Sequence, residues 1–181
     1  MSKVKLAFFS IPEYEKEQEW LQKQHASGLK LVHYTPPFFY HFEECEPQNI
    51  VYQLDYNEEG LAHKEEYIQL FKDCGWEYIE DVGGYSYFRK PVSKMNQGKE
   101  EIFCDDNSRM DMIKRVFKGR MIPLLVLFFL CIVPQLWIQF HLDFPLAKIL
   151  FWLLGIVFLI YIVIFIQFII TYIHLKNRLD S

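Results

Sequence analysis

The sequence lacks the residue patterns that identify most catalytic sites. It contains no Walker loop, no GxGxxG or GxSxG segment, no HExxH motif and no cysteine–histidine spacing typical of zinc. Four cysteines occur in 181 residues, and none forms a Cys-x-x-Cys pair. In a reducing compartment such thiols stay reduced and serve mostly as packing residues. We therefore predict no enzymatic activity, no catalytic residues, no cofactor and no bound metal.

Positive charge is scarce in the first part of the chain. Residues 1–108 contain 11 basic and 20 acidic side chains, whereas residues 109–181 contain 8 basic and 3 acidic ones. An acidic front part argues against nucleic-acid binding, because phosphate recognition needs lysine and arginine. It also argues against lying flat on an anionic membrane surface. About 100 residues suffice for one modest hydrophobic core.

Formal charge is absent from two long apolar runs near the C-terminus. Met121–Phe140 and Ile149–Ile173 comprise 20 and 25 uncharged residues. As helices they would extend about 30 and 37 Å, enough to cross a hydrocarbon layer of about 30 Å. A buried hairpin in a soluble core is the alternative, but no amphipathic partner large enough to cover both helices remains. We predict a transmembrane helical hairpin over 121–173, and no acidic, basic or histidine side chain lies within its spans to form a proton relay.

The distribution of lysine and arginine predicts the orientation of this hairpin. Five bases precede the first span and two follow the second, whereas the short connection contains one, Lys148. The positive-inside rule then places both termini, including a tail at 174–181, in the cytoplasm. Aromatic residues near the span ends fit the two membrane interfaces. The predicted membrane-interface anchors are Arg109, Lys114, Arg115, Lys118, Arg120, Trp137, Trp152 and Tyr172.

The segment 106–120 is expected to form a basic amphipathic helix next to the membrane. Its apolar residues recur at helical spacing, and its polar face is basic. One interpretation is a helix lying on the inner leaflet, with Gly119 allowing the chain to turn into the bilayer. The other is a direct continuation of the first span. Both interpretations make the bases topological anchors.

Residues 1–105 read as an α+β domain built from a duplicated unit. A shift of 47 residues places Val4 on Val51, Gly28 on Gly75 and Tyr40 on Tyr87. Each half has the order strand, helix, glycine, strand, turn, strand. We predict about six strands and two helices that pack on the sheet. An ordinary α+β order without duplication remains the alternative.

The boundaries of these elements follow from apolar patterning and from glycine. Gly28 and Gly75 are expected to end the two helices with positive φ angles. Gly83–Gly84 indicates a tight hairpin, in which Glu77 would lie opposite Lys90. Strands are predicted at 4–11, 29–34, 38–43, 49–56, 76–82 and 85–90, and helices at 13–27 and 64–74.

Aromatic residues are unusually dense on the predicted sheet. One face must meet the helices, and the other would leave tyrosines partly exposed. Tyr40, Tyr78, Tyr85 and Tyr87 are the predicted contact surface for a protein or a flat ligand. The alternative is an aromatic core whose tyrosine tips reach water. His33 and His41 lie on neighbouring strands, where half-buried strand residues are more common than metal ligands.

Several segments resemble an uncharacterised bacterial domain-of-unknown-function family. They are PEYEKEQEWLQKQHASGLKL, YQLDY, YIQLFKDCGWEYI, YFRK and EEIFCDD. Members of this family have such a domain before two membrane spans and are often encoded beside PadR-type transcriptional regulators. The resemblance implies a plasma-membrane protein of a Gram-positive bacterium, in a regulatory pair. It supplies no substrate and no site residues.

Together these features predict a membrane-anchored regulatory or adaptor protein. Its cytoplasmic domain would bind a protein partner or a small ligand, and the hairpin would bind the lipid bilayer and support homo-oligomers. The alternative is an accessory subunit of a membrane transporter, for which Gln135 and Gln139 on one helix face are the only indication.

Overall fold

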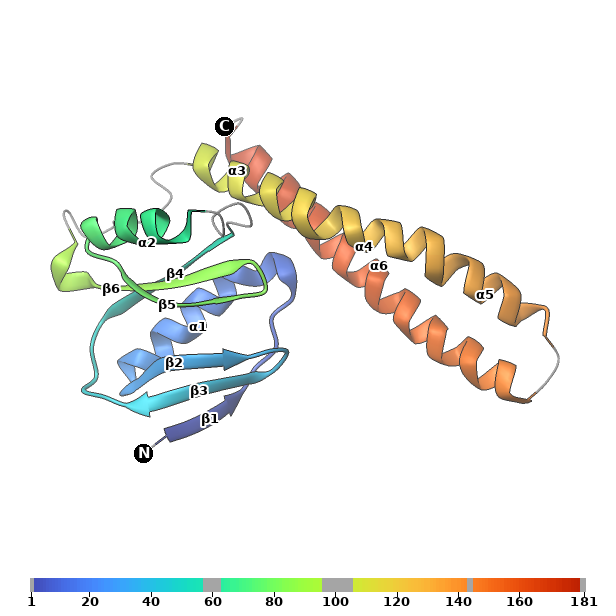
Figure 1. Ribbon diagram of the computed structural model, residues 1–181, viewed down its shortest axis with the longest axis horizontal. Coiled ribbons are helices and arrows are strands. Elements are labelled where there is room, and N and C mark those ends of the chain that lie inside the picture. The colour runs from blue at the N-terminus through green and yellow to red at the C-terminus, as the bar shows by residue number, and fades with distance from the viewer. Residues whose placement is uncertain (1, 57–62, 96–105, 143–144, 180–181) are drawn as a thin grey trace. The chain divides into compact units, whose positions relative to one another are not determined.

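The computed structural model describes residues 2–56, 63–95, 106–142 and 145–179. Its first part confirms the predicted α+β domain of six strands and two helices (Figure 1). The elements are β1 (Ser2–Leu6), α1 (Tyr14–Ala26), β2 (Leu29–Thr35), β3 (Phe39–Glu44), β4 (Ile50–Tyr56), α2 (Lys64–Asp73), β5 (Glu77–Val82) and β6 (Tyr85–Pro91).

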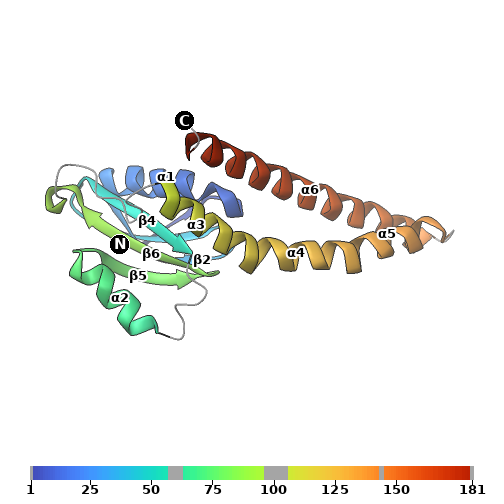
Figure 2. The same cartoon turned by 90° about the horizontal axis from the view of Figure 1, so that it is seen from above.

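The six strands form two antiparallel sheets rather than the single sheet that we predicted. The strand orders are β1-β3-β2 and β4-β6-β5. Helix α1 lies between the two sheets, and α2 covers the opposite face of the second sheet (Figures 1 and 2). This layering gives the second sheet a helix on each face and the first sheet a helix on one face only.

Helix α1 is central because one of its stripes is buried. A short helical turn, η1 (Ile11–Glu13), precedes it and carries a capping box between Ser10 and Glu13. The buried stripe consists of Tyr14, Glu17, Leu21 and His25, spaced three or four residues apart. Gly28 follows with a φ angle of 87°, as the sequence predicted for a residue that ends a helix.

The second hairpin has the predicted turn but a shifted register. Gly83 and Gly84 adopt φ angles of 58° and 84°, which few residues other than glycine tolerate. A bulge between Tyr78 and Glu80 then displaces the pairing by one residue. Glu77 therefore lies opposite Arg89 rather than Lys90, so that prediction was wrong.

The chain divides into two compact units, Met1–Met112 and Ile113–Ser181. The helix that leads into the second unit is continuous from residue 106 to residue 140. It consists of α3 (Asp106–Val116), η5 (Phe117–Met121), α4 (Ile122–Leu127), η6 (Phe128–Ile132) and α5 (Val133–Phe140). The helix therefore continues through Gly119 into the first apolar run, which agrees with the second interpretation and not with a turn at Gly119.

Two prolines explain the π-helical turns of this long helix. The turns η5 and η6 end two residues before Pro123 and Pro134, which lie in the first turns of α4 and α5. A proline has no N–H for the carbonyl four residues earlier, and its ring collides with that carbonyl. One extra residue in the preceding turn relieves the collision without breaking the helix.

The second apolar run lies in α6 (Pro145–Leu179), which packs along α5. Met110–Phe140 and Pro145–Asn177 are long and apolar enough to cross a membrane. In the most apolar stretch of each, only 11% and 0% of the residues are buried, unlike the core helix of a soluble protein. Since large apolar side chains exposed all along two helices need an apolar solvent, we conclude that this part associates with a membrane.

Candidate functional site

A buried carboxylate joins the two sheets through α1. Tyr40 from β3 and Tyr87 from β6 both donate hydroxyl hydrogen bonds to Oε1 of Glu17, at 2.8 and 2.7 Å. Burial raises the pKa of Glu17 above its ordinary value, although the two hydrogen bonds act in the opposite direction. Glu17 is only 7% exposed, so its geometry suits a structural link between sheets rather than contact with a substrate.

A second set of polar contacts joins the sheets near the other end of α1. The Tyr52 hydroxyl lies 2.8 Å from Nδ1 of His25 and accepts a hydrogen bond from the Leu31 N–H at 3.2 Å. Arg89 donates to the Leu31 carbonyl at 3.0 Å and to Oε2 of Glu77 at 2.8 Å. These bonds satisfy buried polar groups and hold the edge of the first sheet against the second.

The histidines considered as metal ligands take part in a different arrangement. His33 Nδ1 lies 2.7 Å from a carboxylate oxygen of Glu80. The His33 and His41 rings lie 5.5 Å apart, and His41 Nε2 lies 3.2 Å from the Thr35 hydroxyl. Within residues 2–56, 63–95, 106–142 and 145–179, no group of three potential ligands is placed to hold a metal ion.

The predicted tyrosine contact surface is wrong for three of its four members. Tyr40, Tyr85 and Tyr87 are 1%, 7% and 2% exposed, because α1 covers the faces on which they lie. The Tyr85 hydroxyl donates to the carbonyl of Ile11, which confirms that it points inward. Tyr78 is half-buried on the face that meets α2. The alternative of an aromatic core fits these rings, but the hydroxyls of Tyr40, Tyr85 and Tyr87 bond within the domain instead of reaching water.

The exposed apolar surface lies instead on the outer face of the first sheet. Val4, Leu6 and Phe39 are 54%, 71% and 44% exposed, and Leu6 pairs with Phe39 across β1 and β3. Val4 pairs with His41 on the same face. We call Val4, Leu6, His33, Phe39 and His41 the open sheet face. The alternation of apolar residues along β1 was the signal in the sequence that could have identified it.

The predicted membrane-interface anchors lie on the two long helices. The bases among the described side chains occur on α3 and η5, before the first apolar run. Trp137 and Trp152 are 69% and 72% exposed near the connection of the hairpin, and Tyr172 lies toward the far end of α6. The two tryptophans therefore lie near one end of the hairpin and Tyr172 near the other, and their place at the membrane interfaces stays a prediction.

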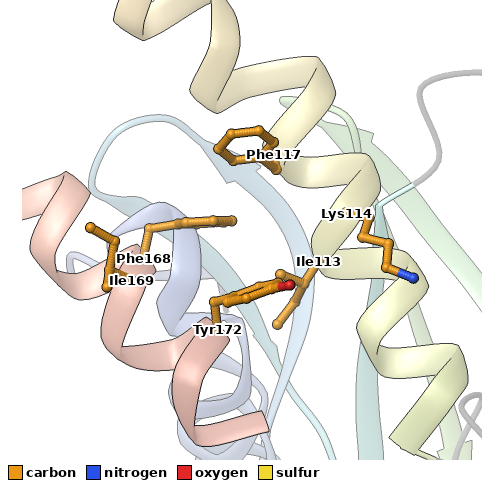
Figure 3. A pocket seen from close by; sticks show the side chains of 6 residues that line it. All are labelled: Ile113, Lys114, Phe117, Phe168, Ile169 and Tyr172. Carbon is orange, nitrogen blue, oxygen red and sulfur yellow. The ribbon is translucent and has the colours of Figure 1, made fainter. Parts of the chain in front are cut away.

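A groove lies between the two helices of the hairpin at the end that carries the bases. Side chains from both helices form its walls, with rings of Phe117 and Phe168 whose centroids lie 5.7 Å apart (Figure 3). Its volume is about 360 Å³. The lining side chains are Ile113, Lys114, Phe117, Phe168, Ile169 and Tyr172.

A family model described as a protein of unknown function, DUF2812, matches residues 13–127. The match begins at Glu13, the last residue of η1, and extends into the first apolar run. Neither the comparison with curated proteins nor the comparison with solved structures gives a match.

Proposed function

Since the chain belongs to the DUF2812 family, whose description states no activity, we propose its function from the structure. We propose that it is a membrane-anchored regulatory or adaptor protein without catalytic activity. The hairpin anchors it in a bacterial plasma membrane, and the α+β domain binds a protein partner in the cytoplasm.

The open sheet face is the observation that carries this proposal. The corresponding face of the second sheet, with Tyr85 and Tyr87, is covered by α1, whereas Leu6 and Phe39 of the first sheet are exposed. Exposed apolar residues that cluster on a flat sheet mark a surface that a partner covers. The excess of acidic over basic side chains in residues 1–108 limits non-specific association of the domain.

We further infer that the domain arose by duplication, which explains why the two faces correspond. Both halves have the same strand order, with one helix after the first strand. The strand bulges fall between Leu31 and His33 in one half and between Tyr78 and Glu80 in the other, 47 residues later. His33 contacts Glu80, its equivalent under this shift, as expected for residues near a pseudo-twofold axis.

The hairpins of the two halves differ in length, which refines the predicted overlay. The first hairpin connects Thr35 to Phe39, and the second connects Val82 to Tyr85 with one residue fewer. The third strands of the two halves therefore correspond at a shift of 46 residues instead of 47. Each helix then packs on the equivalent face of its own sheet. Trp20 of α1 contacts Phe42 of β3, and Phe71 of α2 contacts Phe88 of β6. The two sheets therefore have equivalent faces that differ in exposure. Helix α1 covers this face of the second sheet, whereas the same face of the first sheet is open.

Affinity capture from gently solubilised membranes tests the proposed partner surface. The full chain with Leu6→Glu should lose a partner that the unaltered chain retains, because a carboxylate would be buried in the interface. The fold should persist, because Leu6 is 71% exposed. Loss should be at least tenfold in quantitative mass spectrometry.

Leu70→Glu is the matched control, because Leu70 is 63% exposed on α2, away from the open sheet face. It should capture the same partner as the unaltered chain. Equal capture by both variants would reject the open sheet face as the binding surface. Far-ultraviolet circular dichroism of both variants checks that the domain is folded.

The alternative function, an accessory subunit of a membrane transporter, is favoured by two polar atoms in the hairpin. Oε1 of Gln139 and Oε1 of Gln167 are buried and have no hydrogen-bond partner in the part of the chain that the structure describes. Further helices that donate hydrogen bonds to such groups would stabilise the association of these helices in a membrane. Co-purification of a protein with many spans, lost in Gln139→Leu and retained in Leu6→Glu, would support this alternative.

A further inference from the structure

We infer that the groove between the two helices of the hairpin binds an anionic phospholipid, with one acyl chain between the helices and the headgroup beside Lys114. This inference rests on the proposed membrane placement of the hairpin and is independent of any protein partner. It assigns a lipid site to a groove whose lining includes Lys114 and Tyr172, which the sequence suggested only as membrane-interface anchors.

The walls of the groove fit an acyl chain. Four of the six lining side chains are purely apolar, and the Tyr172 ring reaches across the groove toward Ile113 (Figure 3). Phe117 and Phe168 form one end, with ring planes inclined by 32°. The volume of about 360 Å³ lies within the range of about 300–1,000 Å³ that ligand sites occupy.

The position of the groove along the helices fits the headgroup boundary. Ile113 and Phe117 come just before the apolar run that begins at Met121, and Ile169 and Tyr172 come at the end of the other run. At this level hydrocarbon gives way to headgroups, so one end of a bound lipid would lie in each environment. The Tyr172 hydroxyl offers a hydrogen bond at that boundary.

The charge beside the groove selects an anionic headgroup. Lys114 borders the groove and is exposed, with its ammonium group on the side of the helix away from Tyr172 (Figure 3), and Lys118 follows one turn later on the same helix. Lys176 follows Tyr172 by one turn on α6, so both helices present a base at this end. A phosphate with a net negative charge gains from each of these bases, whereas a zwitterionic headgroup gains less.

Native mass spectrometry of the delipidated full chain in detergent tests the inference. The chain should bind one phosphatidylglycerol in preference to phosphatidylcholine, and free glycerol phosphate should neither bind nor compete. Lys114→Gln should weaken phosphatidylglycerol binding about fivefold, the effect of one base near a lipid surface. Lys148→Gln, which removes one charge at the opposite end of the hairpin, should have no effect.

Two neighbouring isoleucines provide a matched test of the acyl-chain position. Ile169 and Ile170 are 54% and 60% exposed, but only Ile169 lines the groove. Ile169→Trp should fill the groove and abolish the preferential binding of phosphatidylglycerol, whereas Ile170→Trp should bind this lipid as the unaltered chain does. Circular dichroism of both variants reports whether the helices persist.

Three outcomes would overturn the inference. Equal affinity for the two phospholipids would reduce the site to ordinary lipid contact. Competition by glycerol phosphate would indicate a site for free anions, and unchanged binding in folded Ile169→Trp would place the lipid elsewhere. Because the measurement uses purified protein, its failure leaves partner capture by the open sheet face unaffected and separately measurable.

Discussion

At the residue scale, Glu17 has a role that its neighbours in the sequence do not share. It belongs to a run of four glutamates, Glu13, Glu15, Glu17 and Glu19, which reads as a solvated helix face. Only the residue in phase with Tyr14 and Leu21 is buried. The helical period of the buried stripe, rather than the charge of the run, was the signal that could have identified it.

Glu17 should make the domain less stable as the pH rises. The unfolded chain ionises this carboxyl near its ordinary pKa of 4.5, whereas burial raises the pKa in the folded domain. Stability from this residue is therefore complete below about pH 4.5 and is lost as the pH rises through the folded pKa, by at most about 1.4 kcal/mol per pH unit. Thermal unfolding of the full chain in detergent, followed by near-ultraviolet circular dichroism, measures this slope.

Two variants separate the charge of Glu17 from its hydrogen bonds. Glu17→Gln keeps an oxygen that accepts from Tyr40 and Tyr87 and removes the charge, so its stability at pH 8 should equal or exceed that of the unaltered chain. Glu17→Ala leaves two buried hydroxyls without an acceptor and should cost about 2–4 kcal/mol. A glutamine variant as unstable as the alanine variant would show that the ionised carboxylate itself stabilises the fold.

Glycines with similar backbone angles should differ in their tolerance of a side chain. Gly75 and Gly84 have φ angles of 81° and 84°. A Cβ atom at Gly84 would lie 2.6 Å from Cε2 of the buried Tyr56 ring, whereas at Gly75 its nearest neighbour is Cε of Lys90 at 3.4 Å.

Alanine substitutions at these two glycines test this difference. Gly75→Ala should cost about 1 kcal/mol from the backbone alone. Gly84→Ala should cost about 1–3 kcal/mol more, because the ring must move within the core. Thermal unfolding of the two variants under identical conditions gives the comparison, and equal losses would contradict it.

At the scale of elements, the sequence predicted which segments are helices and strands better than it predicted their packing. Periodicity and glycine identified six strands and two helices, because these signals are local. The division into two sheets depends on α1 inserting between them, which no local pattern encodes. The bulge at Ile79 likewise moved Glu77 from Lys90 to Arg89, and a one-residue shift also reverses which side chains face inward.

The candidate site was predicted least well, for the same reason. Tyr85 and Tyr87 have the composition of a contact surface, but α1 covers them. Exposure is decided by which faces the helices cover, and this requires the three-dimensional arrangement. The open sheet face lies on the first sheet, whose three strands contain four aromatic residues against six in the strands of the second sheet.

The prolines of the first apolar helix offer a test at this scale. Pro134→Ala restores an N–H that can bond to the carbonyl of Leu130, so η6 should convert to ordinary α-helix. Hydrogen exchange of the segment 128–136 in detergent should slow by about tenfold or more, since proline costs about 3 kcal/mol in a helix interior. Unchanged exchange would mean that the π turn has a cause other than this proline.

At the scale of the whole molecule, charge and hydrophobicity divide the chain in the same way as its contacts. The acidic α+β domain belongs to the unit Met1–Met112, and the apolar helices belong to Ile113–Ser181. Bases are concentrated around the boundary between them. This arrangement suits a protein whose binding domain is held near a membrane without adhering to an anionic surface.

The last prediction concerns the proposed orientation in the membrane, which cysteine labelling can measure. Cys74 is exposed in the α+β domain, whereas Leu142 is 38% exposed in the connection between the apolar helices. Two single-cysteine chains, one with Cys74 and one with Leu142→Cys, carry serine at every other cysteine. A membrane-impermeant maleimide applied to intact cells should label only the Leu142→Cys chain, because the bases that flank the hairpin keep both termini inside.

Cys74 should react after permeabilisation. Labelling of Cys74 in intact cells would invert the topology and would place the open sheet face, with any partner it binds, outside the cell.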